Sequence, residues 1–188
     1  MLRPRVKLVA LPLLELRTAE LLQVRLNFVG KNLGRVVLNA MLIPLFYQFN
    51  RTGICICIRD DEGTFVLAKG IPVTHVYLIP MGGALGLFYA LEWLGNMGFD
   101  NDDFSLDSKI TTDAFNSRRV DITKFGQVLS ACRQLFDTKF TNSKVEFIRR
   151  QTNEVTHHLA GVAALLTSLT IYTNVPRCIE QIIDNEML

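Results

Sequence analysis

The clearest hydrophobic pattern in the chain begins at Gly53. Residues Gly53–Arg59 are apolar at successive positions, so both faces of this strand are expected to be covered, as in the middle of a sheet. The segment Asp60-Asp61-Glu62-Gly63 follows, and Gly63 is able to take the positive φ that a tight turn requires. Thr64–Lys69 then returns as a second strand. The pattern therefore predicts a β-hairpin.

Helical periodicity dominates the chain after this hairpin. Apolar residues recur at three- and four-residue steps, which is the spacing of one helix face. Gly98 is expected to end the first helix. Short alternating runs between the helices indicate strands. In chain order the pattern predicts a helix at Ala84–Met97, a strand at Asp103–Asp107, helices at Lys109–Asn116 and Thr123–Phe136, a strand at Ser143–Arg149 and a helix at Asn153–Leu166.

The order of these elements predicts an α/β fold. Part of Val36–Phe49, an uncharged stretch broken by Pro44, is expected to add a strand before the hairpin. A meander of three strands, followed by strands joined through helices, gives a mixed five-stranded sheet with helices on both faces. We predict one such domain at residues 36–172, with an unmatched basic extension at 1–35 and a tail at 173–188.

The composition is that of a folded chain with a basic start. Of the 188 residues, 49% are hydrophobic and 20% are charged, which excludes a disordered chain. The formal net charge of +2 is too small to imply a polyanionic partner by itself. Residues 1–50 hold seven Lys and Arg against two Glu. This basic arm suits contact with nucleic acid or a membrane surface, and it equally suits a solvated extension.

The four cysteines lack the spacing of a metal site. Cys55 and Cys57 alternate within a strand and therefore point to the same face, while Cys132 and Cys178 stand apart. Because no second closely spaced pair follows, a zinc site is not expected. Buried, reduced thiols in an intracellular protein, nuclear or cytoplasmic, are the better interpretation.

Two uncharged stretches are long enough to raise the question of a membrane span. Gly70–Leu91 contains two prolines and several glycines, which suit a strand, a loop and a helix start. Val155–Pro176 carries His157, His158 and several threonines on an amphipathic pattern. We predict that both stretches belong to the core and that the protein has no membrane partner.

Asp107 is the first candidate for chemistry. It ends the run Phe104-Ser105-Leu106 and stands just before a predicted helix. An acidic residue at the carboxyl end of a strand, ahead of a helix, is a common place for a catalytic or metal-binding group. Asp is also a preferred helix cap. The local sequence leaves both roles open.

Several short strings, in the same order, resemble the ribonuclease H type 1 domain. More narrowly, they are similar to the plant RNase H-like domains related to retroelement reverse transcriptases. The strings are Arg59-Asp60-Asp61-Glu62-Gly63-Thr64-Phe65, Ala84-Leu85-Gly86-Leu87, Leu106-Asp107-Ser108-Lys109 with Asp113-Ala114-Phe115-Asn116, and Phe147–Asn153 leading to His157-His158-Leu159-Ala160. The resemblance implies a ribonuclease H-like fold, nucleic-acid binding and cleavage of the RNA strand of an RNA–DNA hybrid.

The same resemblance implies a site for two divalent cations, usually Mg²⁺, between carboxylates. Mg²⁺ prefers oxygen ligands. Matched residue by residue, only Asp107 is retained. The first-strand acid falls near Met41, the acid at the head of the first helix at Gly83, and the last-helix acid at His157, where the plant group resembles this chain in having His. We therefore expect weak or no Mg²⁺ binding at Asp107 and an absent or very weak nuclease activity.

Basic and polar residues near Asp107 are candidates for contact with nucleic acid. They are Lys109, Arg149, Arg150 and Asn153. Arg and Lys supply most of the sequence-independent affinity for nucleic acid, and a solvated strand end is the alternative. Two further functions stay open for the chain, a non-enzymatic protein-interaction module and a decayed gene product without function.

Overall fold

The computed structural model describes residues 37–45, 51–99, 101–149 and 154–186. The chain divides into two compact units, Met1–Asn32 and Leu33–Leu188, and the described residues belong to the second. The expectations for the basic arm therefore lie outside the described residues. No helix within the described ranges has the length and apolar character that crossing a membrane requires.

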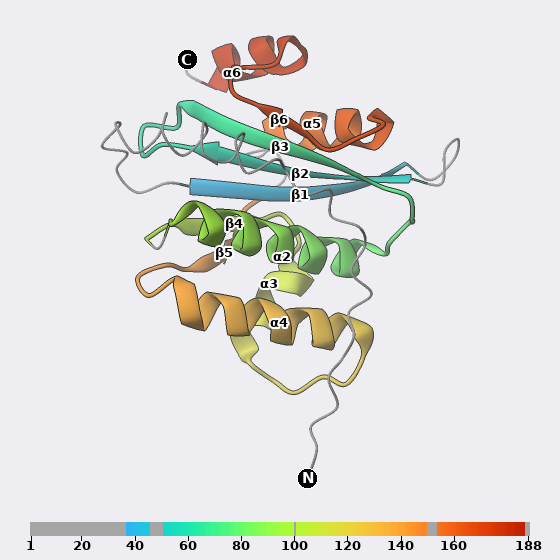
Figure 1. Ribbon diagram of the computed structural model, residues 1–188, viewed down its shortest axis with the longest axis vertical. Helices are drawn as coiled ribbons and strands as arrows, with labels where there is room; N and C mark the ends of the chain where they lie inside the picture. The colour runs from blue at the N-terminus through green and yellow to red at the C-terminus, as the bar shows by residue number, and fades with distance from the viewer. Residues whose placement is uncertain (1–36, 46–50, 100, 150–153, 187–188) are drawn as a thin grey trace. The chain divides into compact units, whose positions relative to one another are not determined.

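A mixed sheet of six strands forms the centre of the second unit (Figure 1). Strands β1, β2 and β3 form an antiparallel meander, while β4 and β5 run parallel to β1. This arrangement confirms the predicted meander with crossovers. In the sheet order β5-β4-β1-β2-β3-β6, the strands are β5 Val145–Phe147, β4 Asp103–Leu106, β1 Val37–Leu45, β2 Arg51–Arg59, β3 Phe65–Val73 and β6 Thr170–Tyr172.

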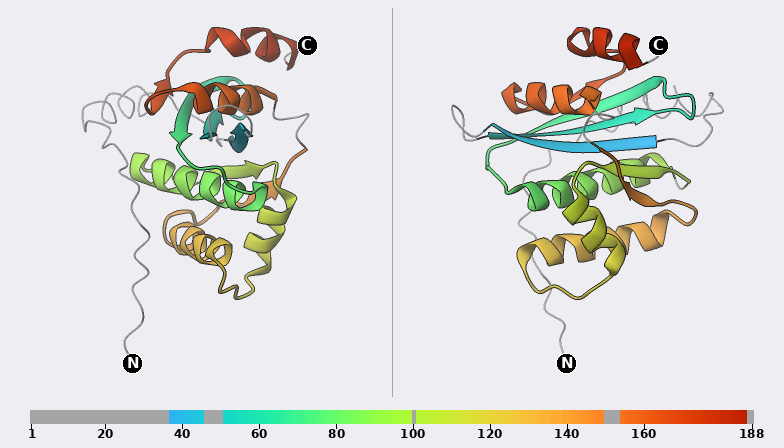
Figure 2. Two further views of the ribbon diagram at one scale, coloured as in Figure 1. Left: turned by 90° about the vertical axis from the view of Figure 1, so that its right-hand side faces the viewer. Right: turned by 180° about the vertical axis from the view of Figure 1, so that it is seen from behind.

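Helices cover both faces of the sheet, as the sequence predicts. Figures 1 and 2 show α2, α3 and α4 on one face and α5 and α6 on the other. The bounds are α2 Ile79–Met97, α3 Lys109–Ser117, α4 Lys124–Lys139, α5 Glu154–Leu165, the 3₁₀ turn η2 Arg177–Ile179 and α6 Glu180–Glu186. The α/β fold class is therefore confirmed. The sheet carries one strand more than the five predicted, because β6 pairs antiparallel with β3.

Local residue chemistry explains where several elements begin and end. Gly63 and Gly98 have φ of 82° and 81°, so the hairpin turn and the end of α2 use the glycines that the sequence predicts for them. The Ser108 and Thr123 side chains accept hydrogen bonds from backbone N–H groups of α3 and α4 and cap these helices. Helix α2 begins at Ile79, five residues before the predicted start, because it includes Pro80 in its first turn.

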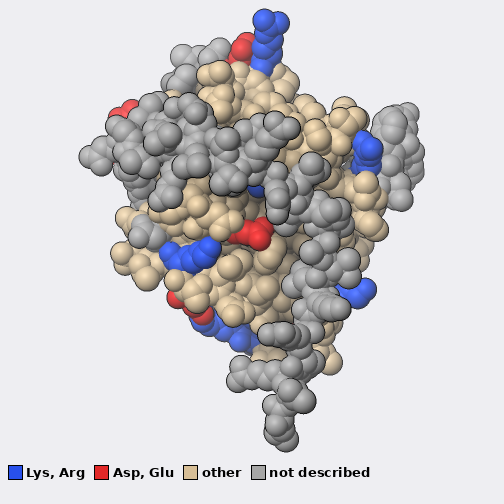
Figure 3. Space-filling view, in the orientation of Figure 1, with Lys and Arg blue, Asp and Glu red and all other residues tan. Residues whose placement is uncertain are grey.

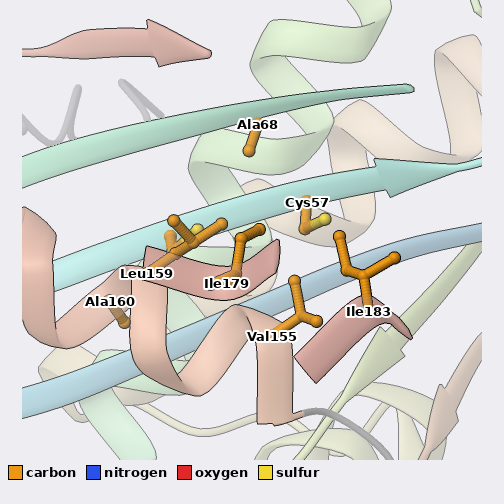
Figure 4. Packing of buried hydrophobic residues seen from close by; sticks show 8 residues of the cluster. Cys57, Ala68, Val155, Leu159, Ala160, Ile179 and Ile183 are labelled. Carbon is orange, nitrogen blue, oxygen red and sulfur yellow. The ribbon is translucent and has the colours of Figure 1, made fainter. Parts of the chain in front are cut away.

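The core between the sheet and α5 is built from small residues and thiols (Figure 4). Cys55 and Cys57 are both fully buried there, which confirms that they share one face. Neither belongs to a disulfide within the described residues, and Cys132 is a third buried cysteine in the thiol form. Burial without a cationic neighbour raises the pKa of Cys55 well above its usual value. These thiols are therefore packing groups rather than nucleophiles.

Gly53 allows α5 to rest directly on β2. A Cβ at this position would lie only 2.5 Å from the backbone nitrogen of Ala164 and would also collide with the carbonyl oxygen of Ala160. Backbone atoms cannot rotate away, so α5 itself would have to move. Gly70 on β3 also lies under α5, but there the nearest atoms are the Ala163 and Leu166 side chains at 3.3 Å.

We expect Gly53→Ala to lower the free energy of unfolding by about 3 kcal/mol, because the added methyl group meets backbone rather than flexible side chains. Gly70→Ala should lower it by about 1 kcal/mol or less, since Leu166 can adjust. Urea unfolding of both variants measures the difference. Equal losses would contradict the close contact of α5 with β2.

Candidate nucleic-acid site at the carboxyl edge of the sheet

Strand pairing brings two of the family acid positions together. Strands β1 and β4 run parallel, and Ala40 is the partner of Leu106 at the end of their register. The residues that follow this pair in the sequence are Met41, after Ala40, and Asp107, after Leu106. The two positions are therefore neighbours, with Met41 in the middle of β1 and Asp107 just beyond the carboxyl end of β4. Asp107 is half-buried there.

A network of hydroxyl groups follows Asp107. Ser108, not Asp107, is the N-cap of α3, and its Oγ accepts a hydrogen bond from the Thr111 backbone N–H at 3.3 Å. The two side-chain oxygens of Ser108 and Thr111 lie 2.7 Å apart. Thr111 Oγ1 also donates to the Pro80 carbonyl oxygen at 3.1 Å, so it receives its hydrogen bond from Ser108. The network ties the start of α3 to the start of α2.

Gly83 packs directly against this network. A Cβ at Gly83 would lie 2.6 Å from Thr111 Oγ1 and 2.9 Å from Ser108 Cβ. Both of these residues are buried. The family resemblance matches an acidic side chain to the position of Gly83, and any side chain there requires Ser108 and Thr111 to shift. The space that a carboxylate would need is therefore already filled by two hydroxyl side chains.

The position of the fourth family acid lies in the first turn of α5. His157 is half-buried there, and its ring centroid lies 6.0 Å from that of His158 with the planes at 90°. His158 is exposed, and its Nδ1 lies 3.2 Å from the Glu154 carbonyl oxygen. Adjacent residues on a helix do not share a face, so the two rings are not arranged as a pair of ligands.

The residues at this edge do not fit a pair of Mg²⁺ ions. Across the described ranges, no group of three or more His, Cys, Asp or Glu side chains is placed to hold a metal. Asp103 lies at the other end of β4, with its carboxylate 3.7 Å from Lys144 Nζ. Asp113 pairs with Lys109 at 2.7 Å on the surface of α3. Neither acid takes the place of the carboxylates that the family uses.

Two of the four predicted nucleic-acid contacts lie at this edge. The Ile148 N–H donates to the Leu106 carbonyl at 2.9 Å, which places the exposed Arg149 beside the end of β4. Lys109 is exposed in the first turn of α3. Arg150 and Asn153 lie outside the described residues. On the face drawn in Figure 3, Lys and Arg side chains are interspersed with Asp and Glu rather than gathered in one field.

Exposed apolar side chains near this edge were missed by sequence reasoning. Leu78, the N-cap of α2, and Ile79, its first residue, are 77% and 65% exposed, and Ile110 is 62% exposed in α3. The prediction that the whole of Gly70–Leu91 belongs to the core is therefore wrong for Leu78 and Ile79. A helix start at Pro80 would have indicated that these two residues precede the buried stripe.

Solved structures with the same fold include ribonucleases H and a viral reverse transcriptase. An RNase H1 from the halophilic archaeon Halobacterium salinarum NRC-1 has a TM-score of 0.59 and 21% identity, over 69% of this chain and 97% of that one. LC11-RNase H1, isolated from compost by a metagenomic approach and solved with an RNA/DNA hybrid, has a TM-score of 0.61 and 14% identity, over 69% and 96%. At these identities the likeness shows the fold.

A foamy viral protease-reverse transcriptase in complex with an RNA/DNA hybrid has a TM-score of 0.56 and 13% identity, over 69% of this chain and 19% of the viral one. A comparison with curated proteins finds no match. The sequence profile of the reverse transcriptase-like family, however, matches residues 47–163, more than half of the chain. The chain therefore belongs to the reverse transcriptase-like family, and it has the fold of a retroelement RNase H-like domain.

Proposed function

We propose that this chain is a catalytically degenerate RNase H-like domain, a pseudoenzyme that binds an RNA–DNA hybrid or a duplex without cutting it. Its fold is shared with LC11-RNase H1 and the foamy viral reverse transcriptase, both solved with RNA/DNA hybrid. The narrower kinship with plant retroelement domains belongs to this proposal and rests on the short strings in the sequence. The proposed domain spans residues 36–172, with the tail at 173–188 packed through η2 and α6.

The packing of Ser108 and Thr111 against Gly83 carries the proposal. Hydrolysis of a phosphodiester by this fold needs two cations held by several carboxylates. Here the hydroxyl groups of α3 occupy the space of one of these carboxylates. Asp107 alone offers Mg²⁺ a single protein carboxylate at this edge. Loss of one essential group costs orders of magnitude in rate, so we expect no useful cleavage.

Binding is proposed to rest on Lys109 and Arg149 at the carboxyl edge, together with Arg150 and Asn153, which the sequence places near Asp107. Lys109 pairs with Asp113, but their side chains are 67% and 62% exposed. A surface ion pair of this kind contributes little to stability, so Lys109 can exchange its partner for a phosphate. Contacts of this type fix a duplex by its backbone and carry no sequence preference.

A protein-interaction module is the second candidate function. The exposed side chains of Leu78, Ile79 and Ile110 favour it, because apolar groups gathered near one edge are typical of a protein contact. The charged phosphate backbone of a duplex has no apolar surface against which these side chains could pack. The salt dependence of binding to nucleic acid separates the two candidates.

We expect the purified protein to bind a labelled RNA–DNA hybrid more tightly as salt is lowered, and to leave it uncut in Mg²⁺ or Mn²⁺. Affinity rises because fewer counterions oppose the contacts with phosphate. Fluorescence anisotropy between 50 and 200 mM salt, roughly the range over which such contacts respond, measures binding, and gel analysis measures cleavage.

Asp107→Asn is the matched control for this experiment. Cleavage by the natural chain that disappears in Asp107→Asn would show a working metal site and overturn the degenerate reading. A flat titration at low salt would remove the nucleic-acid proposal and leave the protein-interaction module.

The salt slope tests the two basic residues separately. Arg149→Ala and Lys109→Ala should each reduce the slope of log affinity against log salt by about 1, uniformly across sequences, because each removes one phosphate contact. Lys139→Ala is the control, since its Nζ lies 3.4 Å from Asn96 Oδ1 near the far end of α2 from Gly83. An unchanged slope in both variants would place the duplex elsewhere.

The filled space at Gly83 is tested by adding a single methyl group. We expect Gly83→Ala to lower the free energy of unfolding by about 1–2 kcal/mol, because the buried Ser108 and Thr111 side chains must move. Gly95→Ala is matched on the same helix. Its Cβ would lie 2.5 Å from Lys139 Cδ, but this flexible side chain can swing away.

Gly95→Ala should therefore be neutral or stabilising by up to about 1 kcal/mol, because alanine is the better helix former. Thermal and urea unfolding of the two variants provide the comparison. A Gly83→Ala protein as stable as Gly95→Ala would show that room for a side chain exists at the family acid position.

A further inference from the structure

Lys69 and Trp93 form a buried polar pair between β3 and α2. Their side chains are only 7% and 3% exposed. Alternation along β3 explains the direction of Lys69, because its neighbour Ala68 packs into the α5 core on the other face. The Lys69 Nζ lies 5.0 Å from the centroid of the Trp93 ring, which is cation–π geometry.

Neither side chain has an oxygen to receive its hydrogen bonds. The buried Nε1 of Trp93 has no hydrogen-bond partner. Lys69 makes no hydrogen bond or ion pair within the described part of the chain; its ammonium lies over the indole face, and Glu92 acts on it through charge alone. The buried unpaired donor of the pair is therefore Nε1 of Trp93. Buried donors that remain unpaired are rare and costly. Desolvation lowers the pKa of Lys69 to about 8, which reflects this cost.

The chemistry of the pair specifies its ligand. An ammonium offers three donors and an indole one, and neither accepts a hydrogen bond. A ligand that satisfies both must therefore be an acceptor, and the positive charge selects an anion. Nζ lies over the face of the ring and Nε1–H points along its edge, so a group with two oxygens is the smallest ligand that serves both donors.

We propose that Lys69 and Trp93 bind a small oxyanion, a carboxylate or a phosphate, between β3 and α2. The site is separate from the carboxyl edge of the sheet, and the proposal does not depend on nucleic-acid binding. Charge-assisted hydrogen bonds from Lys69 hold the anion, and the indole N–H orients it. Glu92 opposes binding by its charge and limits the site to a single anion.

Trp93 is the only tryptophan in the chain, so its fluorescence reports on this site directly. Acetate and inorganic phosphate, titrated separately at pH 7 and constant ionic strength, distinguish a carboxylate site from a phosphate site. We expect a saturable change with at least one of them. Lys69→Met should weaken binding at least about tenfold, because it removes a charged hydrogen-bond donor.

Lys124→Met is the matched control, because Lys124 is exposed at the start of α4 and its loss changes the net charge equally. It should bind the anion as the natural chain does. An equal response from Lys69→Met and the natural chain, or no saturable response to either anion, overturns the proposal. If neither anion gives a saturable response, water rather than an anion is the partner of Lys69 and Trp93.

The pH dependence of acetate binding tests the same site without a substitution, in case Lys69→Met does not fold. Acetate stays ionised across the range, whereas Lys69 loses its proton near pH 8. Affinity should therefore fall as the pH rises through about 8. The other titratable groups nearby are Glu92 and Tyr89, and burial raises the pKa of Tyr89. Acetate affinity that is unchanged up to pH 10 overturns the proposal.

Stability gives a further readout. The pKa of Lys69 is lowered from 10.5 in the unfolded chain to about 8, so the unfolded chain binds more protons between these values. The burial penalty is complete below pH 8 and is relieved as the pH rises. Without anion at pH 7, the melting temperature of Lys69→Met should be higher than that of the natural chain. Saturating anion should stabilise the natural chain alone and so narrow the difference in melting temperature. An identical shift with anion in both proteins contradicts the assignment.

Discussion

The structure depends on close packing against two glycines, where a neighbouring element occupies the space that a side chain would need. At Gly53, the backbone of α5 rests on β2 with no room for a methyl group. At Gly83, the first turn of α2 meets the Ser108 and Thr111 side chains in the same way. The first contact seats a helix on the sheet and serves stability. The second fixes the start of α2 against α3 at a position where the family holds an acid, so here tight packing and a metal ligand exclude one another.

Local periodicity predicted the elements whose pattern is strong. The hairpin through Gly63 and the helix that ends at Gly98 could be predicted from the sequence, because turn chemistry and helix spacing are local properties. Strand β6, at Thr170–Tyr172, was missed since three residues give no alternation and its pairing with β3 is a tertiary contact. The early start of α2 was missed because Pro80 stands in a stretch whose prolines and glycines suit a strand, a loop or a helix start alike.

The site was predictable in part. Matching strings to a family located Asp107 and Gly83, but the meeting of Met41 with Asp107 follows from the parallel register of β1 and β4, which no local pattern contains. The filling of the acid position by hydroxyl groups is also invisible in the sequence, where Ser108 has the pattern of an ordinary helix cap. The Lys69–Trp93 pair requires two elements to pack together, and neither residue alone signals it.

Loss of the acids changes the electrostatics of the edge as well as its chemistry. A cluster of carboxylates repels a phosphate backbone unless cations lie between them. The resemblance matches three of the acid positions to a glycine, a methionine and a histidine. Under the proposed function that repulsion is largely absent, so Lys109 and Arg149 would meet phosphates without a bridging metal. Under the proposed function, binding is therefore independent of Mg²⁺ beyond its effect as a salt. A nuclease of this fold would instead bind its substrate through the cations it also needs for cleavage.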